Sequence, residues 1–399
     1  MLEKVEVIYM GEIKCGPKTG VLLLAGGHFM IDFYNNFLPV LLPIIMVRMD
    51  MSLTMCGLLV MVLSITANLL QPIFGYIFDK HNFSRSMVYA VALSGVFMCV
   101  VGYAPNKLVL FLLCALLGVA VSAYHPLGTS LLRKVSSKMN MGRSVSIYVA
   151  GGNIGFALAP VLVVAFLDRF PLESLPVLII PGVLLAAAYI FTNLWNLPSK
   201  SDKPSDEAVE TDFKSILRNI DVVRLNLAMG FRCWTHVSVV TFLPLLMQSK
   251  GISAVMSGTL LGVFLVGSAI GGLFGGEIGD RTNHKKVMAY SLVLAIIPVV
   301  YFFLMPNTSI LAIIALFFAG ALLMAPQPSS IVWTGHLMPQ FIGVASGMMM
   351  GLCYGIGSIG AAVTAVLGDY IGLETALLIS IVPVFLAIFM IVRTPYREV

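Results

Sequence analysis

Charged residues are scarce in this sequence. They make up 11% of the 399 residues, whereas hydrophobic residues make up 59%. A soluble domain carries roughly 25% charged residues. No water-soluble fold of this size could hide so much apolar surface, so the solvent for most of the chain must be lipid. The net charge of +5 comes from basic residues spread between apolar segments, which indicates a membrane and not a nucleic-acid partner.

Three further absences narrow the function. The six cysteines lie far apart and form no CxxC pair, so we expect neither a disulfide framework nor a metal cluster. No G-x-x-x-x-G-K-[ST] nucleotide-binding loop occurs. The longest polar stretch, 197–221, is too short to fold as an ATPase domain, and no nucleophile constellation stands out. We therefore expect no enzyme activity and no cofactor, with energy taken from a proton gradient or from the substrate's own gradient.

Apolar runs long enough to cross a membrane dominate what is present. About twenty helical residues cross ~30 Å of hydrocarbon. We expect an all-α polytopic membrane protein with twelve spans, near 20–47, 53–78, 86–104, 108–130, 142–168, 175–196, 222–248, 254–279, 286–305, 309–332, 342–368 and 373–393. The first run contains several polar residues, which makes it a poor secretion signal, so we interpret it as a retained first span.

The twelve spans divide into two halves. We predict a cytoplasmic N-terminal segment, a six-helix bundle, a linker, a second six-helix bundle and a tail, at 1–19, 20–196, 197–221, 222–393 and 394–399. In the linker, Phe213, Ile216, Leu217 and Ile220 follow helical spacing. This pattern predicts either an amphipathic helix on the membrane surface or an extension of the seventh span.

The distribution of Lys and Arg predicts the orientation. If the N-terminus is cytoplasmic, the inside segments hold 19 of the 24 basic residues and the outside loops hold four. The remaining one, Arg232, falls inside a span. Because short cytoplasmic loops carry an excess of Lys and Arg, we expect a cell-membrane protein with both termini in the cytoplasm.

The halves repeat each other at an offset of just over 200 residues. The segment from Gly75 to Asp79 and Lys80 matches the segment from Gly276 to Asp280 and Arg281. Phe37-Leu38-Pro39 in the first span likewise matches Phe242-Leu243-Pro244 in the seventh. Six-span halves of equal orientation are parallel repeats that enclose a central cavity, which rocking of the halves exposes to either side in turn.

The repeated G-x-x-x-D-[KR] loop resembles the signature of the major facilitator superfamily, and the resemblance covers nearly the whole chain. It implies two pseudo-symmetric six-helix bundles and gating contacts through Gly75, Asp79, Gly276, Asp280 and Arg281. Both copies depart from the usual pattern at a second glycine, where Asn82 and Asn283 stand. A plain solvated turn is the alternative interpretation of each copy.

Three shorter segments resemble one branch of this superfamily. Ala123-Tyr124-His125-Pro126, the stretch from Gly26 to Asp32, and the stretch from Arg232 to Pro244 are similar to the fosmidomycin-resistance branch. The resemblance implies proton-coupled export of small, polar, often anionic compounds. Gly151, Gly155 and Pro160 in span 5 resemble, without the full spacing, a glycine-proline motif of exporters in the superfamily.

Asp32 is the most informative single residue, because it alone among the 19 acidic residues sits deep within a predicted span. A carboxylate at mid-membrane costs about 2.5–3.5 kcal/mol on insertion scales. A proton-coupled transporter needs such a group, neutral in one state and charged in another. His28 and Asn36 lie four residues before and after it, on the same helix face. Asp32 and His28 are therefore candidates for proton coupling, and a structural ion pair is the alternative.

Arg232 is the only cation placed within a span, and His236 follows it by one helical turn. Arg stays protonated and so needs a counter-ion. That partner is either Asp32 in the other half or an anionic substrate held bidentately, unless the side chain extends to the membrane surface. We predict substrate contacts from Arg232 and His236, with weaker candidates in Asn36, His125, Gln327 and Tyr354.

The leading hypothesis is a proton-coupled exporter of a small polar or anionic compound, working as a monomer among membrane lipids. An importer or facilitator on the same fold is the first alternative, since fold does not settle direction. A membrane-embedded enzyme that uses His28, Asp32, His125 and His236 as metal ligands is a distant one, because these residues lack compact ligand spacing. We expect no metal site.

Overall fold

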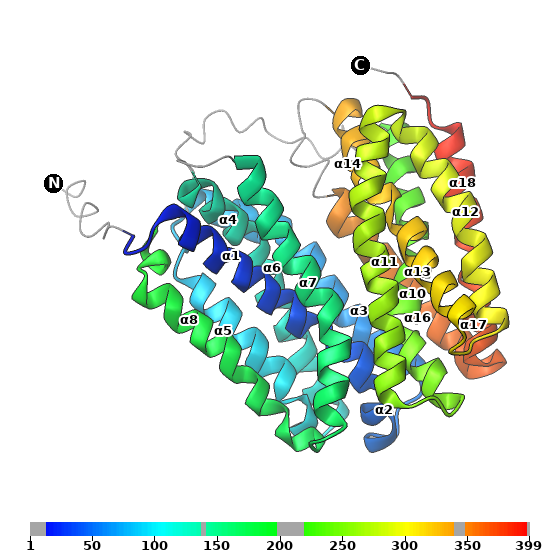
Figure 1. Cartoon of the computed structure of the whole chain (residues 1–399), viewed down its shortest axis with the longest axis horizontal. Helices are drawn as coiled ribbons and strands as arrows, with labels where there is room; N and C mark the ends of the chain where they lie inside the picture. The colour runs from blue at the N-terminus through cyan, green and yellow to red at the C-terminus, as the bar shows by residue number, and fades with distance from the viewer. Residues whose placement is uncertain (1–12, 137–140, 198–218, 339–347, 397–399) are drawn as a thin grey trace. The chain divides into compact units, whose positions relative to one another are not determined.

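A computed structural model describes residues 13–136, 141–197, 219–338 and 348–396 (Figure 1). The regular structure of these residues is entirely helical. The main helices of the first half are α1 (Pro17–Asn35), α2 (Leu38–Arg48), α3 (Leu53–Leu69), α4 (Gln71–Lys80), α5 (Ser86–Cys99), α6 (Lys107–Val135), α7 (Met141–Leu167) and α8 (Ile179–Phe191). Those of the second half are α10 (Ile220–Ser249), α11 (Ala254–Arg281), α12 (His284–Leu304), α13 (Ile310–Met324), α14 (Pro326–Leu337), α16 (Cys353–Ile371), α17 (Leu373–Ile379) and α18 (Val382–Arg393).

Ten helical stretches of the described chain are long and apolar enough to cross a membrane. Two further helices complete the predicted twelve. The apolar helix α5 is shorter, and α10 is 30 residues long but carries Arg232 and His236 near its middle. The prediction of an all-α, polytopic membrane fold is confirmed. The amphipathic pattern from Phe213 to Leu217 lies outside the described residues, and Ile220 is the first residue of α10.

The chain forms two compact units. Unit 1 comprises Met1–Asn36, Leu70–Phe156 and Pro171–Glu207, and unit 2 comprises Phe37–Leu69, Ala157–Phe170 and Ala208–Val399. Parts of spans 1, 2 and 5 therefore pack with the second half of the sequence. The domain boundaries predicted from the sequence stay a prediction.

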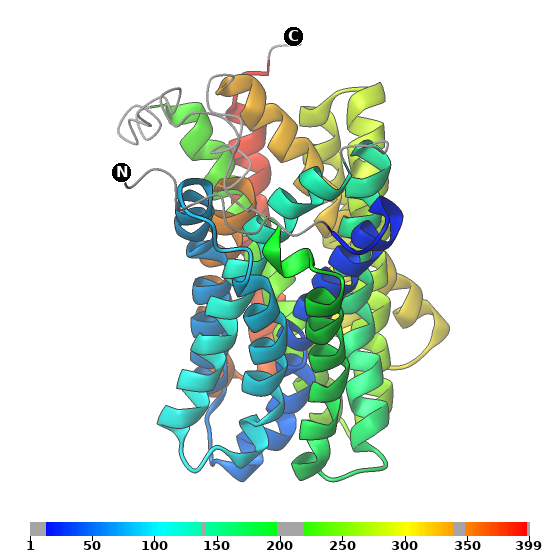
Figure 2. The same cartoon turned by 90° about the vertical axis from the view of Figure 1, so that its left-hand side faces the viewer.

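In unit 1, α1 packs against α5, α6 and α8, and α8 lies beside α5 (Figure 2). Tyrosine hydroxyls tie these helices together. Tyr34 of α1 donates to the carbonyl of Leu178 at 2.7 Å, and Tyr124 of α6 donates to the carbonyl of Leu24 at 2.9 Å. Lipid offers no hydrogen bonds, and these two buried hydroxyls find their acceptors inside the bundle. These bonds fix the position of α1, which carries Asp32.

Close approach of α7 to α1 depends on two glycines. A Cβ built on Gly151 would overlap the carbonyl oxygen of Ala25, and one on Gly155 would overlap that of Phe29. Small residues let membrane helices pack backbone to backbone. The sequence motif in span 5 thus positions one helix against the other.

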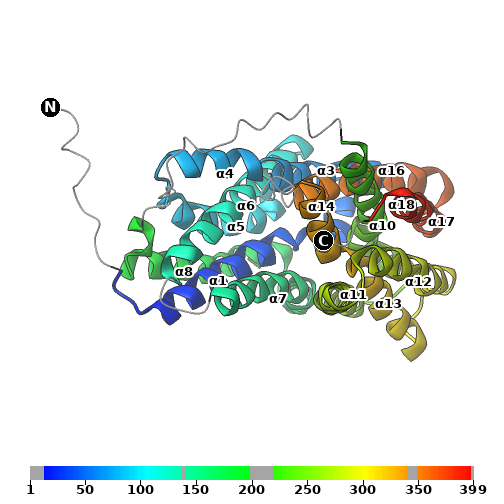
Figure 3. The ribbon, with the colours of Figure 1, turned by 90° about the horizontal axis from the view of Figure 1, so that it is seen from above.

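In unit 2, α10 lies among α2, α11, α16 and α18, and α11 packs on α13 (Figure 3). The core here includes segments from both halves of the sequence, because α3 packs along α16. A Cβ on Gly57 of α3 would stand 2.5 Å from the Cβ of Ala365, which shows how close the two helices lie.

The start of α3 is capped by a side chain from α16. Asp369 accepts from the backbone N–H of Leu53 at 2.9 Å, from that of Thr54 at 2.8 Å and from the Thr54 hydroxyl at 2.6 Å. A carboxylate at a helix N-terminus satisfies amides that have no partner within the helix, and it also complements the helix dipole. One residue of the second half therefore holds the start of span 2.

Replacing Asp369 with alanine should loosen this end of α3. Loss of an N-terminal cap costs about 1 kcal/mol, and Cys56 lies two residues beyond Thr54, fully buried. In a variant with Cys56 as its only cysteine, Asp369→Ala should speed thiol labelling several-fold. Glu374→Gln, which breaks the nearby Lys250–Glu374 ion pair of the second half, is the matched control. Equal labelling rates in both variants would show that the cap does not hold α3.

Candidate functional site

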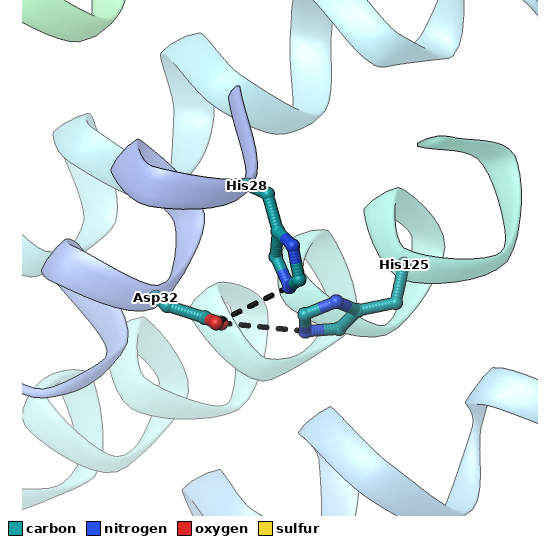
Figure 4. A group of neighbouring side chains, drawn as sticks. All are labelled: His28, Asp32 and His125. Atoms are coloured by element: carbon teal, nitrogen blue, oxygen red, sulfur yellow. Dashed lines mark ion pairs between the residues drawn. The ribbon is translucent and has the colours of Figure 1, made fainter. Parts of the chain in front are cut away.

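Three ionisable side chains meet inside unit 1 (Figure 4). Asp32 Oδ2 lies 3.3 Å from Nε2 of His28 on the same helix, and Asp32 Oδ1 lies 3.5 Å from Nε2 of His125 on α6. The three side chains keep only 12–22% of their surface exposed. The helical spacing places His28 beside Asp32 but indicates no partner for His125. Folding of α6 against α1 joins it to the same carboxylate.

The hydrogen bonding of His28 defines where a proton can sit. Its Nδ1 lies 2.9 Å from the carbonyl oxygen of Tyr148, and a carbonyl only accepts, so Nδ1 carries a hydrogen. The other nitrogen, Nε2, faces Asp32. If the ring were neutral and the carboxylate ionised, the lone pair of Nε2 would face a lone pair of the Asp32 oxygen. One additional proton, on His28 or on Asp32, completes the hydrogen bond. The pair therefore has a place for one exchangeable proton.

Two residues of α7 that the sequence analysis did not assign to the site complete its wall. The Tyr148 ring stacks on His28 with centroids 4.3 Å apart. A Cβ on Gly152 would stand 2.5 Å from His28 Nε2 and 2.6 Å from Asp32 Oδ2. Tyr148 precedes Gly152 by one helical turn, so the two residues lie on the same face of span 5. This spacing was the only sign in the sequence that they belong together. Only the packing of α7 on α1 reveals that both residues face the triad.

Asn36 does not join the triad. It follows the last residue of α1, and its amide donates to the carbonyl of Phe156 on α7 at 2.7 Å. Both residues stand where the chain leaves unit 1 for unit 2. This contact ties the ends of two segments at the point where each crosses between units. Its predicted role in substrate binding stays a prediction.

Unit 2 holds a buried cation. Arg232 of α10 is 0% exposed. Its guanidinium donates to the side-chain oxygen of Gln327 and contacts the sulfur of Met324 at 3.3 Å. Tyr354 of α16 also reaches that sulfur, with its hydroxyl at 3.8 Å. The structure thus brings three of the predicted substrate residues, Arg232, Gln327 and Tyr354, into one cluster.

The cluster lacks a negative charge of its own. Within the described part of unit 2, Arg232 makes no ion pair, and its Nε has no hydrogen-bond partner. A buried charge without a counter-ion is strongly unfavourable. Gln327 is held in turn by its own amide, which donates to the carbonyl of Met349 at 2.7 Å. The arrangement presents a fixed guanidinium that lacks an anion.

His236 contacts a different neighbour. Its Nε2 lies 3.2 Å from the hydroxyl of Ser268, which donates to the carbonyl of Phe264 at 3.0 Å. Since the hydroxyl hydrogen is used there, His236 donates through Nε2, and its Nδ1 remains an acceptor that has no partner among the described residues. The hypothesis that Arg232 pairs with Asp32 joins residues of separate units and stays a prediction.

The predicted gating residues show the internal repeat in three dimensions. Gly75 of α4 faces Pro126 of α6, and Gly276 of α11 faces Pro328 of α14, with built Cβ atoms 3.7 and 3.2 Å from the proline Cβ atoms. The same glycine–proline contact thus recurs in both units. Pro160 belongs to the part of α7 in unit 2, and its carbonyl lies close to Gly258.

The charged members of these loops make local contacts. Asp280, 71% exposed, lies 3.5 Å from His284 Nε2. Arg281 donates to Glu277 one turn earlier at 2.5 Å. The side chain of Asp79 lies outside the described residues. The gating role of all these residues stays a prediction.

His28, Asp32 and His125 also meet a minimal geometric condition for a metal site, since one ligand atom of each lies within 4.8 Å of the others. His236, the fourth residue of the metal-enzyme hypothesis, belongs to unit 2. The four therefore do not form one set of ligands within either unit. The expectation that the triad holds no metal stays a prediction.

The comparisons with known proteins agree with this architecture. The family model described as Major Facilitator Superfamily matches residues 24–362. The chain is 27% identical to the uncharacterised MFS-type transporter YfnC of Bacillus subtilis, over 91% of this chain and 90% of that protein. It is 23% identical to the fosmidomycin resistance protein of Escherichia coli, over 90% and 89%. The crystal structure of the nucleoside transporter NupG superposes with a TM-score of 0.74 at 17% identity, covering 96% of this chain and all of that one.

Gln327 should control the stability of unit 2 through Arg232. Gln327→Ala leaves the guanidinium with one partner fewer and should cost about 1–3 kcal/mol. Gln327→Glu is nearly isosteric and supplies the missing negative charge, but its second oxygen cannot donate to the Met349 carbonyl, so it should melt above Gln327→Ala. Thermal unfolding of the purified protein in detergent measures both. A Gln327→Glu variant less stable than Gln327→Ala would contradict the idea of an uncompensated cation.

Proposed function

The chain belongs to the Major Facilitator Superfamily, and we propose that it is a proton-coupled exporter of a small anionic compound. The family and the relatives named above are transporters, so the chain is a multi-pass membrane transporter and not an enzyme. Proton coupling, the substrate class and the direction are the proposed part. No cofactor is needed, because the proton gradient supplies the energy.

The observation that carries the proposal is the place for one exchangeable proton between His28 and Asp32. A second imidazole, His125, reaches the same carboxylate from another helix. Protonation of Asp32 would weaken its attraction to both rings, so it favours a different separation of α1 and α6. A transporter needs this property, in which the charge of one group is linked to the arrangement of its helices.

The substrate class follows from Arg232. Its fixed guanidinium lacks a carboxylate within the described part of its own unit, and a planar guanidinium binds carboxylate, phosphonate or phosphate groups bidentately. The hydroxyl of Tyr354 is a further polar group of unit 2 that can donate to an anion. Bound substrate would supply the missing negative charge and lower the cost of burying Arg232.

Export is proposed because a relative 23% identical to this chain is named for resistance to fosmidomycin. With both termini in the cytoplasm, Asp369 and the start of α3 face the outside. Their contact would then join α3 to α16 at the outer end of unit 2. We propose a monomer as the transporting unit, because each half already contains one of the two ionisable clusters.

Asp32→Asn should abolish substrate-driven proton movement. Asparagine cannot change charge, so the linkage between protonation and helix arrangement is lost. Proteoliposomes with an enclosed pH-sensitive dye are exposed to a panel of small phosphonates and carboxylates. Wild type should show proton flux with one of them, and Asp32→Asn should fall to the level of empty vesicles while still exchanging labelled substrate.

The matched control is Tyr148→Phe. His28 bonds to the backbone carbonyl of Tyr148, and the hydroxyl has no hydrogen-bond partner in the structure, so its removal should leave the flux unchanged. Proton pumping by Asp32→Asn would refute the coupling role. Substrate passage through wild type without proton flux would identify a facilitator, and flux driven by inward substrate movement would identify an importer.

Arg232→Lys should weaken binding of anionic substrates about tenfold, because the bidentate pair of charge-assisted hydrogen bonds is lost. Gln327→Glu should weaken the same binding, since its carboxylate competes with the substrate for Arg232. Substrate affinity from tryptophan fluorescence titration checks both variants. Unchanged affinity in Arg232→Lys would exclude the residue from the substrate site.

A further inference from the structure

A separate basic pocket lies at one end of unit 2. Its volume is about 520 Å³, and it is lined by Arg224 of α10 and by Phe389, Met390 and Arg393 of α18. The two helices pack against each other, and Arg224 stands near the start of one while Arg393 ends the other. Both arginines therefore lie at the same end of the pair, within a turn or so of the helix ends.

These arginines are only partly neutralised by their neighbours. Arg224 Nη1 lies 3.2 Å from Asp221 Oδ1, and the Arg224 side chain is 41% exposed. Arg393 stacks over the Phe389 ring at 5.2 Å and forms no ion pair with any residue that the structure describes. Of the two, only Arg224 pairs with a carboxylate among the described residues, so the two arginines together leave a net positive charge at the pocket.

The apolar side of the pocket continues along α18. Val382, Phe385 and Phe389 follow each other at intervals of three and four residues and are 53–57% exposed. Side chains at this spacing form one stripe along the helix. In a membrane this exposed stripe faces lipid tails, and it leads directly to the cationic end of the pocket. Positive groups at the interface and an apolar track toward the membrane centre match the two parts of a phospholipid.

We propose that this pocket binds an anionic phospholipid, with its phosphodiester between Arg224 and Arg393 and an acyl chain along Phe389 and Phe385. Basic pockets between transmembrane helices recognise anionic headgroups in this manner. The proposal is independent of substrate and proton coupling, since none of these residues belongs to the clusters around Asp32 or Arg232. It requires only that the protein spans a membrane.

A structural explanation exists for each arginine. Arg393 lies in the last turn of α18, where a cation complements the helix dipole, and Arg224 forms a pair one turn along its own helix. For Arg224, the structural explanation and the lipid proposal predict different effects of Asp221→Asn. If Arg224 serves the Asp221 pair, Asp221→Asn changes lipid binding little. If Arg224 serves a lipid, Asp221→Asn frees its guanidinium and strengthens lipid binding.

Native mass spectrometry of the purified full-length protein measures the test, with phosphatidylglycerol and phosphatidylcholine added in parallel titrations. Each interfacial arginine should be worth about fivefold in affinity for an anionic headgroup, and the two together about thirtyfold. We expect Arg224→Ala/Arg393→Ala to lose that factor for phosphatidylglycerol, and Asp221→Asn to gain about fivefold. Arg224→Lys/Arg393→Lys keeps both charges and should retain most of the binding. This variant serves as the control for folding.

Arg85→Ala is the matched control. Arg85 also stacks on an aromatic ring, that of Trp195 at 5.0 Å, but it belongs to unit 1 and lines no part of this pocket. An equal loss in Arg85→Ala would mean general surface attraction and would overturn the proposal. So would unchanged phosphatidylglycerol affinity in the double alanine variant, or equal affinity for phosphatidylcholine. Inorganic phosphate that raises the melting temperature as much as phosphatidylglycerol would identify a free-anion site instead.

Discussion

The absence of water from the membrane interior constrains every polar group of this protein. A carboxylate, an imidazole or a guanidinium placed there must find its partner among a few neighbouring side chains. Unit 1 meets this demand internally, since Asp32 lies between two histidines. Unit 2 does not, since among the described residues of that unit Arg232 donates its hydrogen bonds to neutral acceptors only. The difference between the two clusters is the basis of the proposed transport chemistry.

Glycines of α7 allow the polar groups of unit 1 to reach their partners. The triad needs α7 close enough for the Tyr148 carbonyl to reach His28, and Gly151 and Gly155 permit that approach by removing side chains at the contact. Gly152 leaves room for His28 and Asp32 themselves. The same helix continues into unit 2, where Pro160 lies near Gly258. A single helix thus contributes to the wall of the triad and to the packing of the other unit.

The division into units suggests how such a protein changes state. Spans 1, 2 and 5 each pass from one unit to the other, at Asn36, Leu69 and Phe156. The first two crossings coincide with interruptions of the helix, between α1 and α2 and between α3 and α4. Polar contacts hold these segments within each unit, with Asn36 bonded to Phe156 in unit 1 and Asp369 bonded to Thr54 in unit 2. These polar contacts tie each crossing segment to the unit in which it lies.

Composition and periodicity alone determined the membrane fold, because apolar runs of about twenty residues have no other stable environment. They also indicated Asp32 and Arg232, since a charge inside such a run is costly and therefore conspicuous. Only the tertiary structure decided the partners. His125 lies 93 residues from Asp32 along the chain and Gln327 lies 95 from Arg232, and no local pattern records such contacts. Tyr148 reaches His28 through its backbone carbonyl, which every residue possesses, and through ring stacking, which depends on how α7 packs against α1. The sequence thus determines which groups are unfavourable in the membrane, and helix packing determines which neighbours compensate them.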